Sequence, residues 1–356
     1  MPLVAFALFA VCVPAPVGAQ TPRPAAPVKA AIAPPVSAAM LAPLAATVRA
    51  ASSHAPYAAG DCNICHQSAD PKQPGPVTRR GPALCLECHD EFAGILKRPH
   101  PHAPAVADCT HCHNPHNATQ PKLVLDAPRV MCTRCHAGIK EILGSASVQH
   151  GALAEGRQCL ACHDPHASAV ERLLLQLPFD LCVGCHASDA LVDAKGRKLQ
   201  NTKAWLDANR EWHGPIAAKD CSACHEPHGG GHFRLLKADY PPEFYAPYDE
   251  RTYALCFSCH NEKAFSSPET TTLTDFRDGP KNMHFLHLQQ GTRGRTCRAC
   301  HEVHASSQPH HIRAGVPYGS GGWVLKLNFR KTPTGGSCDK TCHQERSYSN
   351  RAAGAK

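Results

Sequence analysis

The chain has 356 residues, among them 21 cysteines and 25 histidines but only 21 aromatic residues (11 Phe, 3 Trp and 7 Tyr). With 25 glycines and 32 prolines, it lacks the long apolar stretches from which a chain of this length normally builds two or three domains. So many thiols exclude an ordinary cytosolic enzyme, and a formal charge of +8, taken alone, would favour an acidic partner.

The first 19 residues are predicted to be a signal peptide. Residues 3–13 form an apolar run too short to span a bilayer, and the small residues 17–19 fit a cleavage site before Gln20, although a basic start is missing. Cys12 would be removed with this segment. No other segment is long and apolar enough to cross a membrane, so we expect an exported protein.

Residues 20–50 are rich in Ala and Pro and are predicted to form an extended linker. A short helix within residues 36–49, interrupted at Pro43, is the alternative.

Every cysteine other than Cys12 belongs to one recurring motif. Nine copies read C-x-x-C-H, and a tenth has one extra residue between its cysteines. The cysteines are Cys62, Cys65, Cys85, Cys88, Cys109, Cys112, Cys132, Cys135, Cys159, Cys162, Cys182, Cys185, Cys221, Cys224, Cys256, Cys259, Cys297, Cys300, Cys338 and Cys342. The adjacent histidines are His66, His89, His113, His136, His163, His186, His225, His260, His301 and His343.

This motif indicates covalent attachment of c-type haem. Two thiols add to the two vinyl groups of one haem, and the next imidazole reaches the iron from the same turn of chain. Zinc sites also use C-x-x-C pairs, but their histidines stand at separate spacings, and disulfides impose nothing on the next residue. The sequence therefore predicts ten covalent haems with ten proximal histidines.

The motifs come in five pairs, which we call units 1 to 5. The first cysteines of a pair lie 23 residues apart in units 1 to 3 and 35 and 41 residues apart in units 4 and 5. We expect three compact two-haem units within residues 51–200, two longer ones within 201–346 and a tail at 347–356. Short helices are predicted at Asp90–Lys97 and Ala137–Leu143, and the long segments 229–255 and 302–337 would dock a partner or cover haem edges.

Each iron needs a second axial ligand, and only four methionines exist, of which Met283 alone is suitably placed. Histidine must supply the rest. One histidine precedes each unit by seven to ten residues, another follows four of the first motifs as H-x-x-H, and His100 remains after the second motif of unit 1. The candidate distal ligands are therefore His54, His100, His102, His116, His150, His166, His213, His228, His287 and His304. His284 competes with His287 and His100 with His102, while the roles of His310 and His311 stay open, and the sequence does not say which histidine serves which iron.

The alternation of C-x-x-C-H-x-P-H (residues 109–116, 159–166 and 221–228) with L-C-x-x-C-H (84–89, 181–186 and 255–260) resembles the doubled-CXXCH multihaem cytochromes c, a bacterial family. The resemblance covers residues 54–343 and extends to the ending GGSCDKTCH (335–343). It implies irregular loops and short α-helices around a stacked haem chain, with very little β-structure, and bis-histidine irons of low potential that pass electrons. Unit 1 departs from the pattern because no H-x-P-H follows His66, and unit 5 has Val303 in place of the proline.

The function expected from these features is electron transfer in the envelope of a Gram-negative bacterium, from periplasmic donors to an outer-membrane or extracellular acceptor. Its partners would be other redox proteins, including an outer-membrane porin, with self-association as a further outcome. A multihaem nitrite or hydroxylamine-type oxidoreductase would need a vacant iron position, and the histidine count leaves none, so no catalytic residue is predicted. A polymerising filament would borrow a histidine from a neighbouring subunit. Nucleic acid is not an expected partner, because each ferric haem with its propionates adds about −1 and ten would cancel the basic balance.

Overall fold

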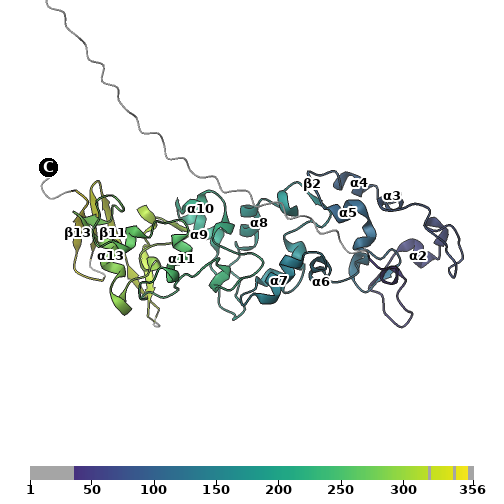
Figure 1. The fold of residues 1–356 in the computed structure, drawn as a ribbon, viewed down its shortest axis with the longest axis horizontal. Helices are drawn as coiled ribbons and strands as arrows, with labels where there is room; N and C mark the ends of the chain where they lie inside the picture. The colour runs from purple at the N-terminus through teal and green to yellow at the C-terminus, as the bar shows by residue number, and fades with distance from the viewer. Residues whose placement is uncertain (1–35, 320–321, 340–341, 352–356) are drawn as a thin grey trace, which may run out of the picture. The chain divides into compact units, whose positions relative to one another are not determined.

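The computed structural model describes residues 36–319, 322–339 and 342–351 (Figure 1). The predicted signal peptide, Cys12, most of the predicted linker and the last five residues of the predicted tail lie outside the described residues. Residues 33–356 form one unit by their contacts. No helix of the described part is long and apolar enough to cross a membrane.

The regular structure consists of short helices and small sheets separated by loops, which confirms the expected fold class (Figure 1). The α-helices are α1 (Ala38–Leu41), α2 (Ala55–Ala59), α3 (Pro82–Cys85), α4 (Glu91–Ile95), α5 (Ala103–Ala107), α6 (Pro128–Thr133), α7 (Ala137–Ser145), α8 (Pro178–Cys185), α9 (Thr202–Ala208), α10 (Gly214–Ala217), α11 (Ala254–Phe257), α12 (Lys263–Ser266) and α13 (Met283–Leu288). The helices predicted near residues 90–97 and 137–143 are α4 and α7.

The two motifs of a unit fold differently. Each first motif begins on a one-turn 3-10 helix: η1 (Cys62–Ile64), η2 (Cys109–His111), η5 (Gln158–Ala161), η7 (Cys221–Ala223) and η11 (Cys297–Ala299). The second motifs of units 1 to 4 lie on or at the end of the α-helices α3, α6, α8 and α11. Proline occupies the first helical position of α3, α6 and α8, where its fixed φ favours the helix and its missing N–H costs nothing.

The strands are β1 (Ser52–Ser53), β2 (His100–Pro101), β3 (Asn117–Ala118), β4 (Ala167–Ser168), β5 (Glu211–Trp212), β6 (Arg277–Asp278), β7 (Lys281–Asn282), β8 (Ala305–Ser306), β9 (Gly315–Tyr318), β10 (Trp323–Lys326), β11 (Asn328–Thr332), β12 (Gly335–Asp339) and β13 (Arg346–Ser349). Most are two residues long. The family resemblance did not predict the β9–β10 hairpin or the β11-β12-β13 antiparallel sheet, which carries Cys338 of the tenth motif.

Two-residue ladders join different units. Ser52 and Ser53, just before His54, pair with Ala118 and Asn117, just after His116. The same antiparallel pairing joins β2 to β4 and β5 to β8, and a bridge between Val148 and Gly230 takes its place between units 3 and 4. The segment before one unit is therefore fixed to the first motif of the next unit.

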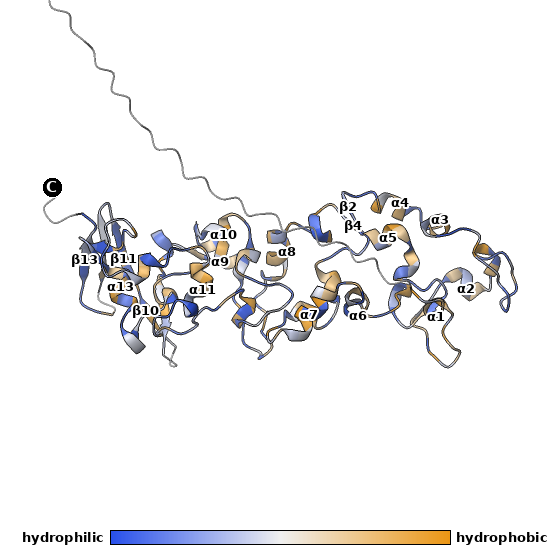
Figure 2. Cartoon of the chain, viewed as in Figure 1, coloured by the Kyte–Doolittle hydropathy of each residue, from blue (hydrophilic) through white to orange (hydrophobic). Residues whose placement is uncertain are grey.

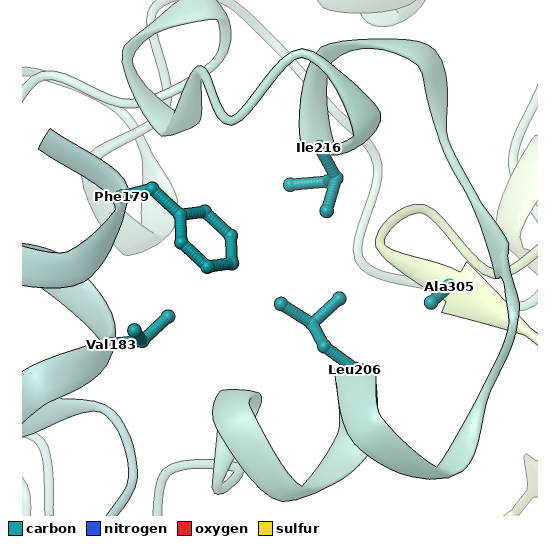
Figure 3. Close-up of a cluster of buried hydrophobic side chains, with 5 residues drawn as sticks. All are labelled: Phe179, Val183, Leu206, Ile216 and Ala305. Atoms are coloured by element: carbon teal, nitrogen blue, oxygen red, sulfur yellow. The ribbon is translucent and has the colours of Figure 1, made fainter.

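Apolar side chains form only a small core. Phe179, Val183, Leu206, Ile216 and Ala305 point toward one another from α8, α9, α10 and β8 (Figure 3), with Trp205 and Trp212 packed at the edge. Elsewhere the apolar residues lie in short stretches along the chain (Figure 2). The few buried apolar side chains agree with the deficit of large apolar residues seen in the composition.

Candidate haem-binding histidines

The histidine of every first motif is oriented by a backbone carbonyl. Nδ1 of His66 lies 2.8 Å from the Gly75 oxygen, and the corresponding bonds run from His113 to Lys122, His163 to Arg172, His225 to Arg234 and His301 to His310 at 2.8–3.0 Å. The acceptor is always nine residues further along the chain. With Nδ1–H donating to this carbonyl, Nε2 carries the lone pair that a metal needs.

The turn that presents this carbonyl has an unusual backbone. In units 2 to 5 two successive residues without exception adopt positive φ, as Arg172 and Leu173 do at 57° and 58°. The left-handed region costs an L-residue roughly 1–2 kcal/mol. Unit 1 uses Gly75 at φ 71°, which glycine adopts without that cost. The recurrence of the turn indicates that the surrounding structure holds it in place.

The histidines upstream of units 1 to 4 are held by the first motif of the next unit. His54 follows β1 and stands at the N-terminal cap of α2. Its backbone N–H donates a 2.8 Å bond to the His116 oxygen, and its Nδ1 lies 3.0 Å from the Pro115 oxygen. His102 and His150 make the equivalent Nδ1 contacts with Pro165 and Pro227 at 2.8 and 3.1 Å. For His54 and His102 both the backbone N–H and the ring are bonded to the next unit, and for His150 the ring is.

Nine of the ten proximal histidines face a second imidazole across a uniform gap. The ring centroids lie 6.1–6.4 Å apart, and the ring planes differ by 8–31°. The pairs are His66–His116, His89–His54, His113–His166, His136–His102, His163–His228, His186–His150, His225–His304, His260–His213 and His301–His284.

This gap fits one metal ion between two axial imidazoles. A metal–imidazole bond of roughly 2.0–2.1 Å and a nitrogen about 1.2 Å from the ring centre put the two centroids about 6.3 Å apart. Near-parallel rings in direct contact would be closer than this. The residues present therefore fit a haem iron with two histidine ligands.

The pairing follows a rule that the sequence did not reveal. The second-motif histidine of units 1 to 4 faces the upstream histidine of its own unit, whereas the first-motif histidine faces the H-x-x-H histidine of the following unit. His66 of unit 1, for example, faces His116 of unit 2. Unit 1 has no H-x-P-H histidine, and the given sequence has no motif before unit 1 that such a histidine would face under this rule.

At unit 5, the last unit of the given sequence, α13 carries two further histidines, His284 and His287. His284 faces His301 at 6.4 Å. Burial lowers the pKa of His287, a bond to the Met283 carbonyl opposes this shift, and the charges of Arg295 and His343 add to it. His284 and His287 are therefore both candidate ligands rather than competitors.

His100 does not face a proximal histidine in the part of the chain that the structure describes. It lies in β2 beside Ser168, and the geometry gives its predicted role to His284. The sequence missed this because it offered no reason to look for two ligands on one helix. His310 supplies the carbonyl that orients His301, and His311 packs edge-on against His213 at 5.5 Å, so both support the site without facing an iron position.

Burial keeps the most enclosed imidazoles neutral. It lowers the pKa of His284 to about 3 and that of His304 to about 4, and nearby histidine and arginine charges add to the effect. The neutral imidazole is the form that binds a metal.

The cysteine pairs form a continuous series of neighbours. Between units, the first cysteine of one motif raises the pKa of, or has its pKa raised by, the first cysteine of the next motif: Cys85 by Cys109, Cys132 by Cys159, Cys182 by Cys221, and Cys297 by Cys256. Within units, the second cysteine of the first motif lies close enough to interact electrostatically with a cysteine of the second motif: Cys65 with Cys88, Cys112 with Cys135, Cys162 with Cys185, Cys224 with Cys259, and Cys300 with Cys338. The electrostatic influence of each cysteine pair thus reaches the motif next to it in the sequence.

Among the described residues no three His, Cys, Asp or Glu side chains converge as they would around a bare metal ion. The cysteines and histidines of this part of the chain are therefore not grouped as in a structural zinc site.

Comparison with known proteins agrees with this geometry. The model of the doubled CXXCH motif matches residues 54–94, 102–141, 150–191 and 213–265, which are units 1 to 4 with their upstream histidines. A comparison with curated proteins finds no match.

Proposed function

Since the chain belongs to the doubled CXXCH motif family and is a multihaem c-type cytochrome, we propose that it carries ten haems and conducts electrons along them at low potential in the bacterial cell envelope. The observation that carries this proposal is the set of nine facing imidazole pairs. Each bound haem supplies an iron that accepts and releases one electron.

The chain's own residues keep both axial positions filled. Backbone carbonyls fix the tautomer of each first-motif histidine, and the inter-unit ladders bring the opposing histidine into line. Because two imidazoles face each other at nine of the ten proposed iron positions, these nine leave no open site for a substrate. This favours electron transfer over substrate turnover.

The order of the attachment sites supports a conduit. Cysteines of successive motifs influence each other's pKa alternately within a unit and between units, which supports attachment sites that follow one another. A serial arrangement of this kind lets an electron enter at one end and leave at the other. Bis-histidine ligation holds the potentials below those of His/Met irons.

The proposed place of this function is outside the cytoplasm. The apolar residues 3–13 and the small residues 17–19 support export. The proposed partners are redox proteins of the periplasm and outer membrane.

The test is a count of haems and of their ligands on the exported protein. We expect an intact mass that includes ten haems and a ferric EPR spectrum made only of low-spin bis-histidine signals. Cys338→Ser combined with Cys342→Ser should remove one haem. A wild-type mass with fewer than ten haems would refute the count, and carbon monoxide binding at one equivalent by the reduced wild type would refute complete bis-histidine ligation.

The location has its own test. Protease applied to intact cells should leave a periplasmic protein whole, whereas digestion from outside would show exposure on the cell surface and exclude a purely periplasmic carrier.

A further inference from the structure

His116 is the only H-x-x-H histidine whose ring is held by a segment outside the repeat units. Its Nδ1 lies 2.9 Å from the carbonyl oxygen of Leu41, at the end of α1. Residues 38–44, which we call the strap, belong to the predicted linker. A contact between this segment and a candidate haem ligand is not expected of an extended linker.

Two asparagines, Asn114 and Asn117, lie on either side of His116 in the sequence and hold the strap by hydrogen bonds, which we call the clasp. The Asn114 amide donates to the carbonyl oxygens of Met40 and Ala42 at 3.2 and 2.9 Å, and the Leu44 N–H donates to the Asn117 side chain at 2.8 Å. Asn114 is 3% exposed. Its side-chain oxygen also accepts a 2.9 Å bond from the His116 N–H, so one residue holds both the ligand and the strap.

The other units show that this clasp is particular to unit 2. The residue after the first-motif histidine is Asp164, Glu226 and Glu302 in units 3 to 5, and each carboxylate forms an ion pair, with Arg98, Lys237 and Arg313 respectively. Among units 2 to 5, only Asn114 carries an N–H₂ group at this position, which is the donor that two backbone carbonyls require. The side-chain amide of Asn114 is therefore suited to the strap carbonyls, whereas units 3 to 5 carry a carboxylate at this position.

The rings of the equivalent histidines lack this support. Nδ1 of His166 lies 3.6 Å from the Asp164 carboxylate, beyond hydrogen-bond length, and within the described residues Nδ1 of His228 and of His304 has no hydrogen-bond acceptor. His116 and its partner His66 are both bonded to backbone carbonyls, from Leu41 and Gly75.

We propose that the strap is a positioning element for the first haem: through the Leu41 carbonyl it fixes the orientation and basicity of His116, the distal ligand opposite His66. A carbonyl that accepts from Nδ1–H makes the imidazole a stronger donor, favours ferric iron and lowers the potential of that iron. The inference rests on the proposed bis-histidine ligation.

Two deletions, with residues 1–20 kept for export, separate the strap from the rest of the linker. Deleting residues 21–35 should change nothing, whereas deleting 21–44 should alter one haem in ten. We expect about a tenth of the low-spin ferric EPR intensity to change its g-values and the same fraction of the redox amplitude to move to higher potential. The remaining signals should coincide with those of the wild type.

A single substitution tests the clasp without shortening the chain. In Asn114→Ser the hydroxyl can still accept from the His116 N–H, but the amide donors to Met40 and Ala42 are lost and no charge is added. We expect the same one-haem change. Glu226→Gln, at the same position of unit 4, is the control and should leave the signal of the first haem untouched.

Unchanged EPR and redox components in both the 21–44 deletion and Asn114→Ser would overturn the proposal, and so would a change spread over all ten haems. Failure of the proposed ligation itself would look different, because the wild-type spectrum would then lack bis-histidine signals.

Discussion

His66 and His116 face each other with ring centroids 6.1 Å apart and planes 12° apart, although they belong to different repeat units. The same relationship joins His113 to His166, His163 to His228 and His225 to His304. In units 1 to 4, the first-motif histidine therefore faces a histidine of the next unit.

Substitution of one distal ligand that comes from the next unit should affect one haem. We expect His166→Met to raise the potential of the haem attached beside His113, because a thioether stabilises ferrous iron better than imidazole does. About a tenth of the amplitude in a spectroelectrochemical titration should move. His100→Met is the matched control and should leave the titration unchanged, and a shift in the control of the same size would contradict the assignment of the distal ligands.

Removal of His284 should open a coordination position. In His284→Ala we expect the reduced protein to bind about one equivalent of carbon monoxide, since His301 would lose its opposing imidazole. His100→Ala should bind none. If the two variants behaved in reverse, His100 rather than His284 would be the tenth distal ligand.

The small apolar core should contribute measurably to stability. Leu206 is 3% exposed and packs against Phe179, Val183 and Ile216, so Leu206→Ala should lower the free energy of unfolding by about 2–5 kcal/mol. Denaturant unfolding followed by Soret circular dichroism measures this difference. Leu177→Ala removes the same atoms from a residue that is 62% exposed and should change stability by no more than about 0.5 kcal/mol.

The left-handed turn that orients His163 should tolerate glycine but not a β-branched residue. Arg172→Gly relieves a left-handed penalty of roughly 1–2 kcal/mol and adds a glycine entropy cost of roughly 0.5–1 kcal/mol, so the net change should stay below about 1 kcal/mol. Arg172→Val should lower the free energy of unfolding, because its branched side chain crowds a backbone at φ 57°. Equal stability of the two variants in denaturant would show that the turn is not strained.

The attachment motifs, the family and the short helices of this protein can be predicted from the sequence alone. Two cysteines and a histidine within five or six residues define each attachment site locally, and the pairing of motifs gave the family and the expectation of short helices, which the structure confirms. The upstream histidines were also visible, because each stands at a fixed place relative to its unit. These features depend on neighbours along the chain.

The assignment of each distal histidine to its iron position was decided by tertiary structure. His116 is far from His66 in sequence, and only the β1–β3 ladder and the Pro115 carbonyl bring them opposite each other. On local sequence alone, His284 and His100 are comparable candidates for a distal ligand. The structure distinguishes them, because α13 places His284 opposite His301. The sequence predicted a linker where the strap lies. The strap bonds to Asn114 and His116 through backbone carbonyls, which every residue has, so its amino-acid composition gives no sign of these bonds. Attachment is local chemistry that the sequence determines, whereas ligation joins distant segments and needs the fold.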